Sequence, residues 1–134
     1  MWYEVKLKVT KQDNKGNDKE IAESFACDVE LFAQAEQKGM EQYNGECDVV
    51  AIKRSNVREF ANDRDTSKAQ NIYKATIEDT FVSDDGSEKK TKYHVALFAT
   101  DVREATSIAE SYMAQGLNDM TLVSVSKTSL LDII

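Results

Sequence analysis

Three side chains of this sequence have the chemistry for metal binding or nucleophilic catalysis: the thiols of Cys27 and Cys47 and the imidazole of His94. A tetrahedral zinc site of the usual kind needs four cysteine or histidine ligands, so this set is one ligand short. Two cysteines in a chain without an export signal are typically reduced and packed as small hydrophobic residues. A catalytic pair of Cys27 and His94 is disfavoured, because the strand alternation described below places the two on opposite sheet faces. We therefore predict no metal, no cofactor and no enzymatic activity.

Motifs for other chemistry are missing from the sequence. It contains no phosphate-binding GxxxxGK[ST] loop, no dinucleotide-binding GxGxxG, no zinc-protease HExxH and no serine-hydrolase GxSxG. The acidic segment Ser83–Glu88 lacks the spaced ligands of a calcium loop, and we interpret it as a solvated turn.

An internal repeat organises the chain. Shifted by 70 positions, Tyr3, Val5 and Leu7 fall on Tyr73, Ala75 and Ile77, and the turn glycine Gly16 falls on Gly86. In both copies apolar residues alternate with polar ones, which predicts strands with one buried face, and the glycine turns predict hairpins. After about three extra residues in the second copy, Ala51–Val57 aligns with Ser124–Leu130.

Each copy also contains a predicted helix. Asp101 and Glu104 predict a capping box at the start of the second helix, and Gly116 ends it. The first helix starts at about Phe32 without a capping residue and includes Gly39, so we expect it to be the weaker one.

The predicted fold class is α+β, with an internal pseudo-twofold repeat of strand-strand-helix-strand. We expect about six mainly antiparallel strands with two helices on one face. The chain is predicted to be a single domain, 1–134, made of a first repeat, 1–58, an exposed connector, 59–71, and a second repeat, 72–134.

The composition fits a cytoplasmic protein. The chain has 134 residues, a formal net charge of -7 and no proline. No apolar run approaches the roughly 18 residues of a membrane span, and the alternation of Met1–Lys6 does not resemble a secretory signal.

The predicted sheet face opposite the core gathers lysines and aromatic residues. Lysines that follow phosphates and rings that stack on bases are typical of proteins that bind single-stranded nucleic acid. The net charge opposes this function, and lysines that merely keep an open sheet soluble are the alternative interpretation. The candidate nucleic-acid-binding residues are Trp2, Lys6, Lys8, Lys53, Arg54, Lys74, Lys92, His94 and Phe98.

Four segments resemble an uncharacterised domain family found in Bacteroidetes and their phages and prophages, over essentially the whole chain. They are Trp2–Lys6, Ile52–Asn56, Tyr73–Ala75 and Leu131–Ile134. In the family pattern an aromatic pair precedes the lysine that opens the second half, whereas Ile72 takes one of those places here. The resemblance implies a small accessory protein of a phage or mobile element in a bacterial host cell, and it carries over no activity.

Two functions are compatible with that setting. The first is a non-enzymatic accessory protein that binds single-stranded DNA or RNA on the open sheet face. The alternative is a protein-interaction module that binds or inhibits a host protein through its acidic surface or the C-terminal segment Ser129–Ile134. That segment aligns with Asn56–Phe60, which favours a packed strand over a free tail.

Overall fold

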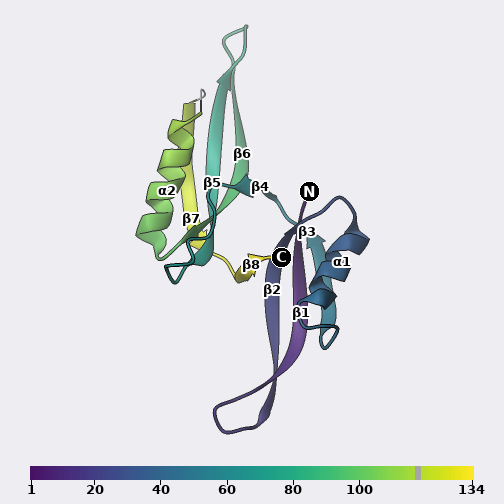
Figure 1. Cartoon of the computed structure of the whole chain (residues 1–134). Coiled ribbons are helices and arrows are strands. Elements are labelled where there is room, and N and C mark those ends of the chain that lie inside the picture. The colour runs from purple at the N-terminus through teal and green to yellow at the C-terminus, as the bar shows by residue number, and fades with distance from the viewer. Residues whose placement is uncertain (117–118) are drawn as a thin grey trace. The chain divides into compact units, whose positions relative to one another are not determined.

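The chain is an α+β protein whose described residues form two helices and eight strands in two mixed sheets (Figure 1). The computed structural model describes residues 1–116 and 119–134. Its contacts divide these residues into two compact units. Unit 1 contains Met1–Ser55 and Ser129–Ile134, and unit 2 contains Asn56–Thr128.

Unit 1 is a four-stranded sheet with a helix on one face. Its elements are β1 (Trp2–Gln12), β2 (Asp18–Asp28), α1 (Phe32–Glu41), β3 (Asp48–Arg54) and β8 (Leu130–Ile133). The strand order is β3-β1-β2-β8, in which β1 pairs antiparallel with β2 and β3, and β8 pairs parallel with β2. The core between sheet and helix consists of Val5, Leu7, Phe25, Cys27 and Ala35. The four strand residues among them occupy the apolar positions that the period-two pattern predicts for a half-buried sheet, and Ala35 is the contribution of α1.

Unit 2 has a sheet and a helix of its own. Its elements are β4 (Val57–Phe60), β5 (Asn71–Val82), β6 (Glu88–Ala99), α2 (Val102–Ala114) and β7 (Asp119–Lys127). The strand order is β4-β6-β5-β7, in which β5 pairs antiparallel with β6 and β7, and β4 pairs parallel with β6. Alanines of α2, Ala105 and Ala109, pack against Tyr73, Ala75 and Leu97 of the hairpin.

The two short parallel strands differ from the prediction of about six mainly antiparallel strands. The predicted third strand of each copy stops early, at Arg54 and at Lys127, and after two residues the chain starts a separate strand. Strand β4 follows β3 in sequence but pairs in unit 2, whereas β8 follows β7 but pairs in unit 1. The two sequence repeats therefore exchange their last strands, and the units, divided at residues 55/56 and 128/129, do not coincide with the repeats.

The hairpin turns are confirmed. Gly16 has φ 79° and Gly86 has φ 84°, the left-handed conformation that glycine adopts without steric cost. In each turn the glycine N–H donates to a carbonyl three residues earlier, over 3.0 Å to Asp13 and 2.9 Å to Ser83. The sequence pattern therefore predicted both hairpin turns at the correct residues.

The helix ends follow the prediction in part. Asp101 accepts a 2.8 Å hydrogen bond from the Glu104 N–H and caps α2 as expected. The Glu104 carboxylate accepts from the backbone N–H of Thr100, one residue before the partner that a capping box requires. Helix α1 has 10 residues against 13 in α2 and has no side-chain cap.

The predicted connector 59–71 is not fully exposed. Its first residues complete β4, and Asn62 then binds the backbone of Phe98 through both amide atoms, at 2.9 Å to the carbonyl and 2.8 Å from the N–H. An asparagine amide can replace a strand partner in this way because it has one donor and one acceptor group side by side.

Candidate functional site

The structure divides the predicted nucleic-acid-binding residues between the two units. Unit 1 holds Trp2, Lys6, Lys8, Lys53 and Arg54, whereas unit 2 holds Lys74, Lys92, His94 and Phe98. Each group is therefore described by itself.

On unit 1, the open sheet face carries three of the predicted lysines, and two of them lie beside carboxylates. Lys53 Nζ lies 3.1 Å from Glu4 Oε2, and Lys8 Nζ lies 3.9 Å from Glu20 Oε1. Among the described residues, Lys6 has no carboxylate within 4.0 Å. These surface pairs add little stability, but they offset the charge of two of the three lysines that a phosphate would meet.

Lys6 and Lys53 line a hollow of about 330 Å³ on this face, together with Glu4, Val5, Ser24, Ala51 and Ser129. Arg54 does not belong to it. Arg54 is paired across the sheet with Tyr3, which packs against the helix-side core, so the two lie on the other face. Trp2 is half-buried.

The prediction that Phe98 is an exposed stacking platform is wrong. Its side chain is only 1% exposed. The Phe60 ring lies 5.4 Å from it, and the Arg64 guanidinium lies 4.8 Å from its ring centroid. Phe60 and Arg64 both belong to the connector 59–71, which was predicted to be exposed. A single phenylalanine and a stacked arginine cover Phe98, and two such residues produce no apolar periodicity from which the cover could be predicted.

On unit 2, the open face keeps its lysines but offers no exposed ring among the predicted residues. Lys74 Nζ donates to Asn56 Oδ1 over 2.8 Å, and Lys92 is paired across the hairpin with Glu78. His94 Nδ1 lies 3.0 Å from Thr76 Oγ1. Burial, together with the charge of Lys74, lowers the pKa of His94, so the imidazole is neutral at pH 7.

The two thiols follow the prediction. Both Cys27 and Cys47 are free, and Cys27 belongs to the unit 1 core. Burial raises the pKa of Cys27, which keeps it a protonated thiol at neutral pH.

Sequence reasoning missed a polar cluster around Glu23. This carboxylate is 9% exposed, lies 2.7 Å from Lys11 Nζ and accepts a hydrogen bond from the hydroxyl of Tyr43. Burial alone would raise the pKa of Glu23, but the hydrogen bonds from Lys11 and Tyr43 outweigh it and lower the pKa. The sequence does contain a signal for this cluster, because Glu23 is a charged residue at a core-facing position of β2, between Ile21 and Phe25. A charged side chain that is buried is almost always paired.

A related arrangement occurs in unit 2. Arg58 lies 3.7 Å from the centroid of the Tyr93 ring, and the Tyr112 hydroxyl donates to Glu59. Burial and the Glu59 hydrogen bond raise the pKa of Tyr112 to about 12. Both clusters connect a helix end to strands, so we assign them a structural role.

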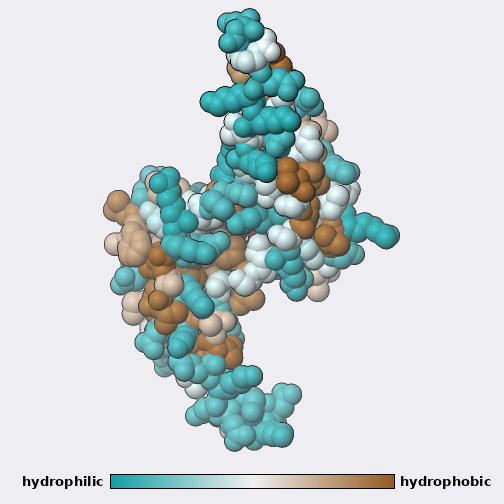
Figure 2. All heavy atoms as spheres, turned by 180° about the vertical axis from the view of Figure 1, so that it is seen from behind, coloured by the Kyte–Doolittle hydropathy of each residue, from teal (hydrophilic) through white to brown (hydrophobic). Residues whose placement is uncertain are grey.

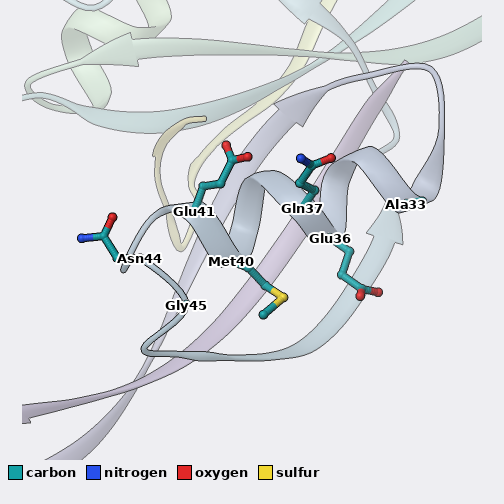
Figure 3. Close-up of a pocket in the computed structure, with 7 residues that line it drawn as sticks. All are labelled: Ala33, Glu36, Gln37, Met40, Glu41, Asn44 and Gly45. Atoms are coloured by element: carbon teal, nitrogen blue, oxygen red, sulfur yellow. The ribbon is translucent and has the colours of Figure 1, made fainter.

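Two hollows of unit 1 are lined by several carboxylates, one along α1 and one beside the segment that follows it. One, of about 430 Å³, is lined by Ala33, Glu36, Gln37, Met40, Glu41, Asn44 and Gly45 (Figure 3). Figure 3 shows Glu36 and Met40 extending from one side of α1, and Gln37 and Glu41 from the other. A second hollow of about 430 Å³ shares Gly45 and is lined by Lys8, Val9, Thr10, Glu20, Glu46, Cys47 and Asp48.

The chain reversal after α1 brings these hollows together. Asn44 and Gly45 have φ values of 52° and 83°, and two successive left-handed residues turn the chain from the helix toward β3. We call the resulting region the acidic surface and define it by Glu20, Glu36, Glu41, Glu46 and Asp48. Met40, 42% exposed, lies among these carboxylates.

The rest of the surface is mixed, and large apolar side chains are exposed at Phe32, Phe81 and Val102, among others. Figure 2 shows that the tip of the β1–β2 hairpin, at the bottom of the view, is hydrophilic. Within the described ranges, no group of three or more His, Cys, Asp or Glu side chains is placed to hold a metal ion. No described helix has the length and apolar character of a membrane span.

Comparison with known proteins gives one result. A family model described as "Domain of unknown function (DUF4494)" matches residues 1–134. No curated protein and no solved structure matches the chain significantly.

Proposed function

The chain belongs to the DUF4494 family, whose description states no activity, and from its geometry we propose that it is a non-enzymatic protein-binding module. The acidic surface of unit 1 is the contact region, and the partner is a protein with a basic surface.

One observation carries this proposal: the two hollows share Gly45 and together collect five carboxylates. Lys8 is the cation that lines them, and its amino group lies 3.9 Å from Glu20. A concave surface of one charge focuses the electrostatic field and accelerates encounter with a partner of the opposite charge. The exposed Met40, which lines the first hollow, supplies an adaptable apolar contact.

The setting of this proposal is a phage or mobile element in a bacterial host cell, with binding or inhibition of a host protein as the outcome. The resemblance of Trp2–Lys6 and Leu131–Ile134 to proteins of that origin supports the setting. Between the two contact regions expected from sequence, the structure favours the acidic surface. The alternative region forms β8, in which Leu130 is buried and from which Ile134 packs against the unit 1 core.

A second candidate function is binding of single-stranded DNA or RNA on the open face of unit 2. The observation that favours it is the placement of Lys74, Lys92 and the neighbouring Lys90 on one hairpin face, beside the hydroxyl of Thr76. Because Phe98 is buried, this face would hold phosphates without stacking on bases. Such binding is weak and falls steeply with added salt.

The two units are further proposed to be copies of one repeat with pseudo-twofold symmetry. The pairing of β1 with β3 shifts register between Lys6 and Leu7, and the pairing of β5 with β7 shifts between Thr76 and Ile77. These two irregularities lie 70 residues apart, the same spacing as the aligned strands and turn glycines.

Charge reversal tests the main proposal. The variant Glu36→Lys/Glu41→Lys changes the acidic surface, and Asp84→Lys/Glu88→Lys is the control, because it makes the same change in net charge at the exposed tip of the unit 2 hairpin. Each immobilised protein is incubated with bacterial lysate at low and high salt, and bound proteins are identified by mass spectrometry.

The proposal expects a basic protein that the wild type and the control retain and the first variant loses. Equal retention by all three proteins would refute it. Retardation of a mixed-sequence single-stranded oligonucleotide, lost in Lys74→Glu/Lys92→Glu, would establish the second function instead.

A further inference from the structure

The hollow of about 330 Å³ on the open face of unit 1 is formed by small side chains around a lysine. Its lining comes from β1, β2 and β3 and from Ser129, which precedes β8. Lys6 of β1 is paired directly with Ser24 of β2 and with Ala51 of β3. Because both neighbours are short and directly paired side chains lie close together, the Lys6 side chain borders space that larger residues would fill.

Three polar side chains of this lining have no partner within the described residues. The amino group of Lys6 and the hydroxyls of Ser24 and Ser129 make no hydrogen bond or ion pair there. All three groups can donate hydrogen bonds. The other charged residues of the lining, Lys53 and Glu4, lie 3.1 Å from each other. Two lysines against one carboxylate leave the hollow with a net positive charge.

The corresponding positions of unit 2 are satisfied within the protein. The central hairpin pair of the hollow corresponds there to Thr76 and His94, and the serine before β8 corresponds to Asn56 before β4. Thr76 Oγ1 lies 3.0 Å from His94 Nδ1, and Lys74 Nζ donates to Asn56 Oδ1 over 2.8 Å. The same arrangement of strands thus supplies internal partners in unit 2, whereas the described residues of unit 1 supply none for the three donors.

We propose that this hollow binds a small phosphate monoester that also carries hydroxyl groups, such as a sugar or polyol phosphate. Lys6 contacts the phosphate as a point charge, and Ser24 and Ser129 donate to its oxygens. Lys53 lies against Oε2 of Glu4, so Oε1 accepts from a ligand hydroxyl. This carboxylate disfavours a chain of phosphates, and the volume suits a small molecule. None of the lining residues belongs to the acidic surface, so the site is independent of the proposed protein contact.

Titration of the full-length protein with glycerol phosphate, followed by amide NMR spectra, tests this site. We expect saturable shifts of the backbone amides around Lys6, Ser24 and Ser129, and none on titration with glycerol, which lacks the phosphate. Lys6→Gln removes the charge and should weaken binding about 10-fold or more. Lys15→Gln is the control, because it makes the same change in net charge at the exposed turn of the same hairpin. It should leave the dissociation constant within about twofold of the wild type.

Two further variants and one further ligand separate a shaped site from simple attraction to surface lysines. Ala51→Ile fills the hollow without changing any charge and should abolish saturable binding, at an exposed strand position that accepts a β-branched residue. Ser24→Ala removes one donor and should weaken binding about 2- to 10-fold. Methyl phosphate lacks the hydroxyl groups and should bind about 2- to 10-fold more weakly than glycerol phosphate.

The amide spectrum of each variant also shows that it remains folded. Absence of saturable shifts up to about 10 mM glycerol phosphate, a concentration at which even weak binding is seen, overturns the proposal. Wild-type affinity in both Lys6→Gln and Ala51→Ile overturns it as well, because the anion would then be attracted by surface lysines without a shaped site. Equal affinity for methyl phosphate would refute the contact between Glu4 and a ligand hydroxyl.

Discussion

The substitution Gly39→Ala is a sharp test, because helix propensity predicts that it stabilises the protein and packing predicts that it destabilises the protein. In an exposed helix, replacing glycine with alanine stabilises by about 1 kcal/mol. Gly39 of α1 is buried against the sheet, and a Cβ placed there would lie 2.8 Å from Val5 Cγ1 and 3.2 Å from Leu7 Cδ2. Both neighbours are fully buried, so neither can move into solvent.

The size of the effect follows from these contacts. Carbon atoms in contact are normally about 3.5 to 4.0 Å apart, so α1 must move away from β1 by roughly 1 Å. Overpacking of this kind costs about 1 to 3 kcal/mol, and two rigid neighbours place Gly39 in the upper part of that range. After the gain in propensity, we expect Gly39→Ala to lower the free energy of unfolding by about 1 to 2 kcal/mol.

Urea unfolding monitored by circular dichroism measures this change. With a slope of about 2 kcal/mol/M, in the middle of the usual range, the midpoint should fall by roughly 0.5 to 1 M. Ala33→Gly, at an exposed position of the same helix, reports the propensity alone and should cost about 1 kcal/mol.

The double variant Val5→Ala/Gly39→Ala removes the closest contact. It should therefore show a favourable coupling of about 1 kcal/mol or more between the two substitutions. If Gly39→Ala instead stabilises the protein by the full propensity gain, the packing argument is refuted.

Three further predictions concern other parts of the molecule. Phe98→Ala should cost about 3 to 5 kcal/mol in thermal or urea unfolding, whereas Phe81→Ala, at a residue 59% exposed, should cost less than about 0.5; equal costs would contradict the burial of Phe98. Because the pKa of Glu23 is lowered in the folded state, its pairing with Lys11 stabilises the protein above the unfolded pKa of about 4.3 and is lost as the pH falls through the folded value. Unfolding measured from pH 7 to 3 should therefore depend less on pH in Glu23→Gln, and an unchanged profile would contradict the assignment. Cleavage at a protease site inserted between Thr66 and Ala69 should leave the two fragments together in size-exclusion chromatography, because β4 pairs with β6 and β8 pairs with β2; separation without denaturant would contradict those pairings.

Local patterns in the sequence predicted the hairpins and the second helix. The glycines of both turns adopt the expected conformation, and Asp101 caps α2. The turns and the helix cap depend on hydrogen bonds and backbone angles of residues only a few positions apart, so a short stretch of sequence is enough to predict them.

The long-range features could not be predicted. Strand β4 has its apolar residues Val57 and Phe60 at its two ends, three positions apart and therefore on opposite faces, and nothing in this pattern specifies β6 as a parallel partner. The cover of Phe98 by Arg64 comes from a residue type that is usually exposed. Lys53 and Arg54 were predicted to lie together as basic residues, but as neighbours in β3 they lie on opposite faces of the sheet.

The exchange of the short strands also affects the order of folding during synthesis. Strand β2 receives its parallel partner from Leu130–Ile133, more than a hundred residues later in the chain. The ribosome has therefore produced almost all of unit 2 before the sheet of unit 1 can be completed. Closing so long a loop is slow, and until then the free side of β2 is open to other strands. The unit that begins to form first is thus the last to finish, and a chaperone that shields β2 would help most during this interval.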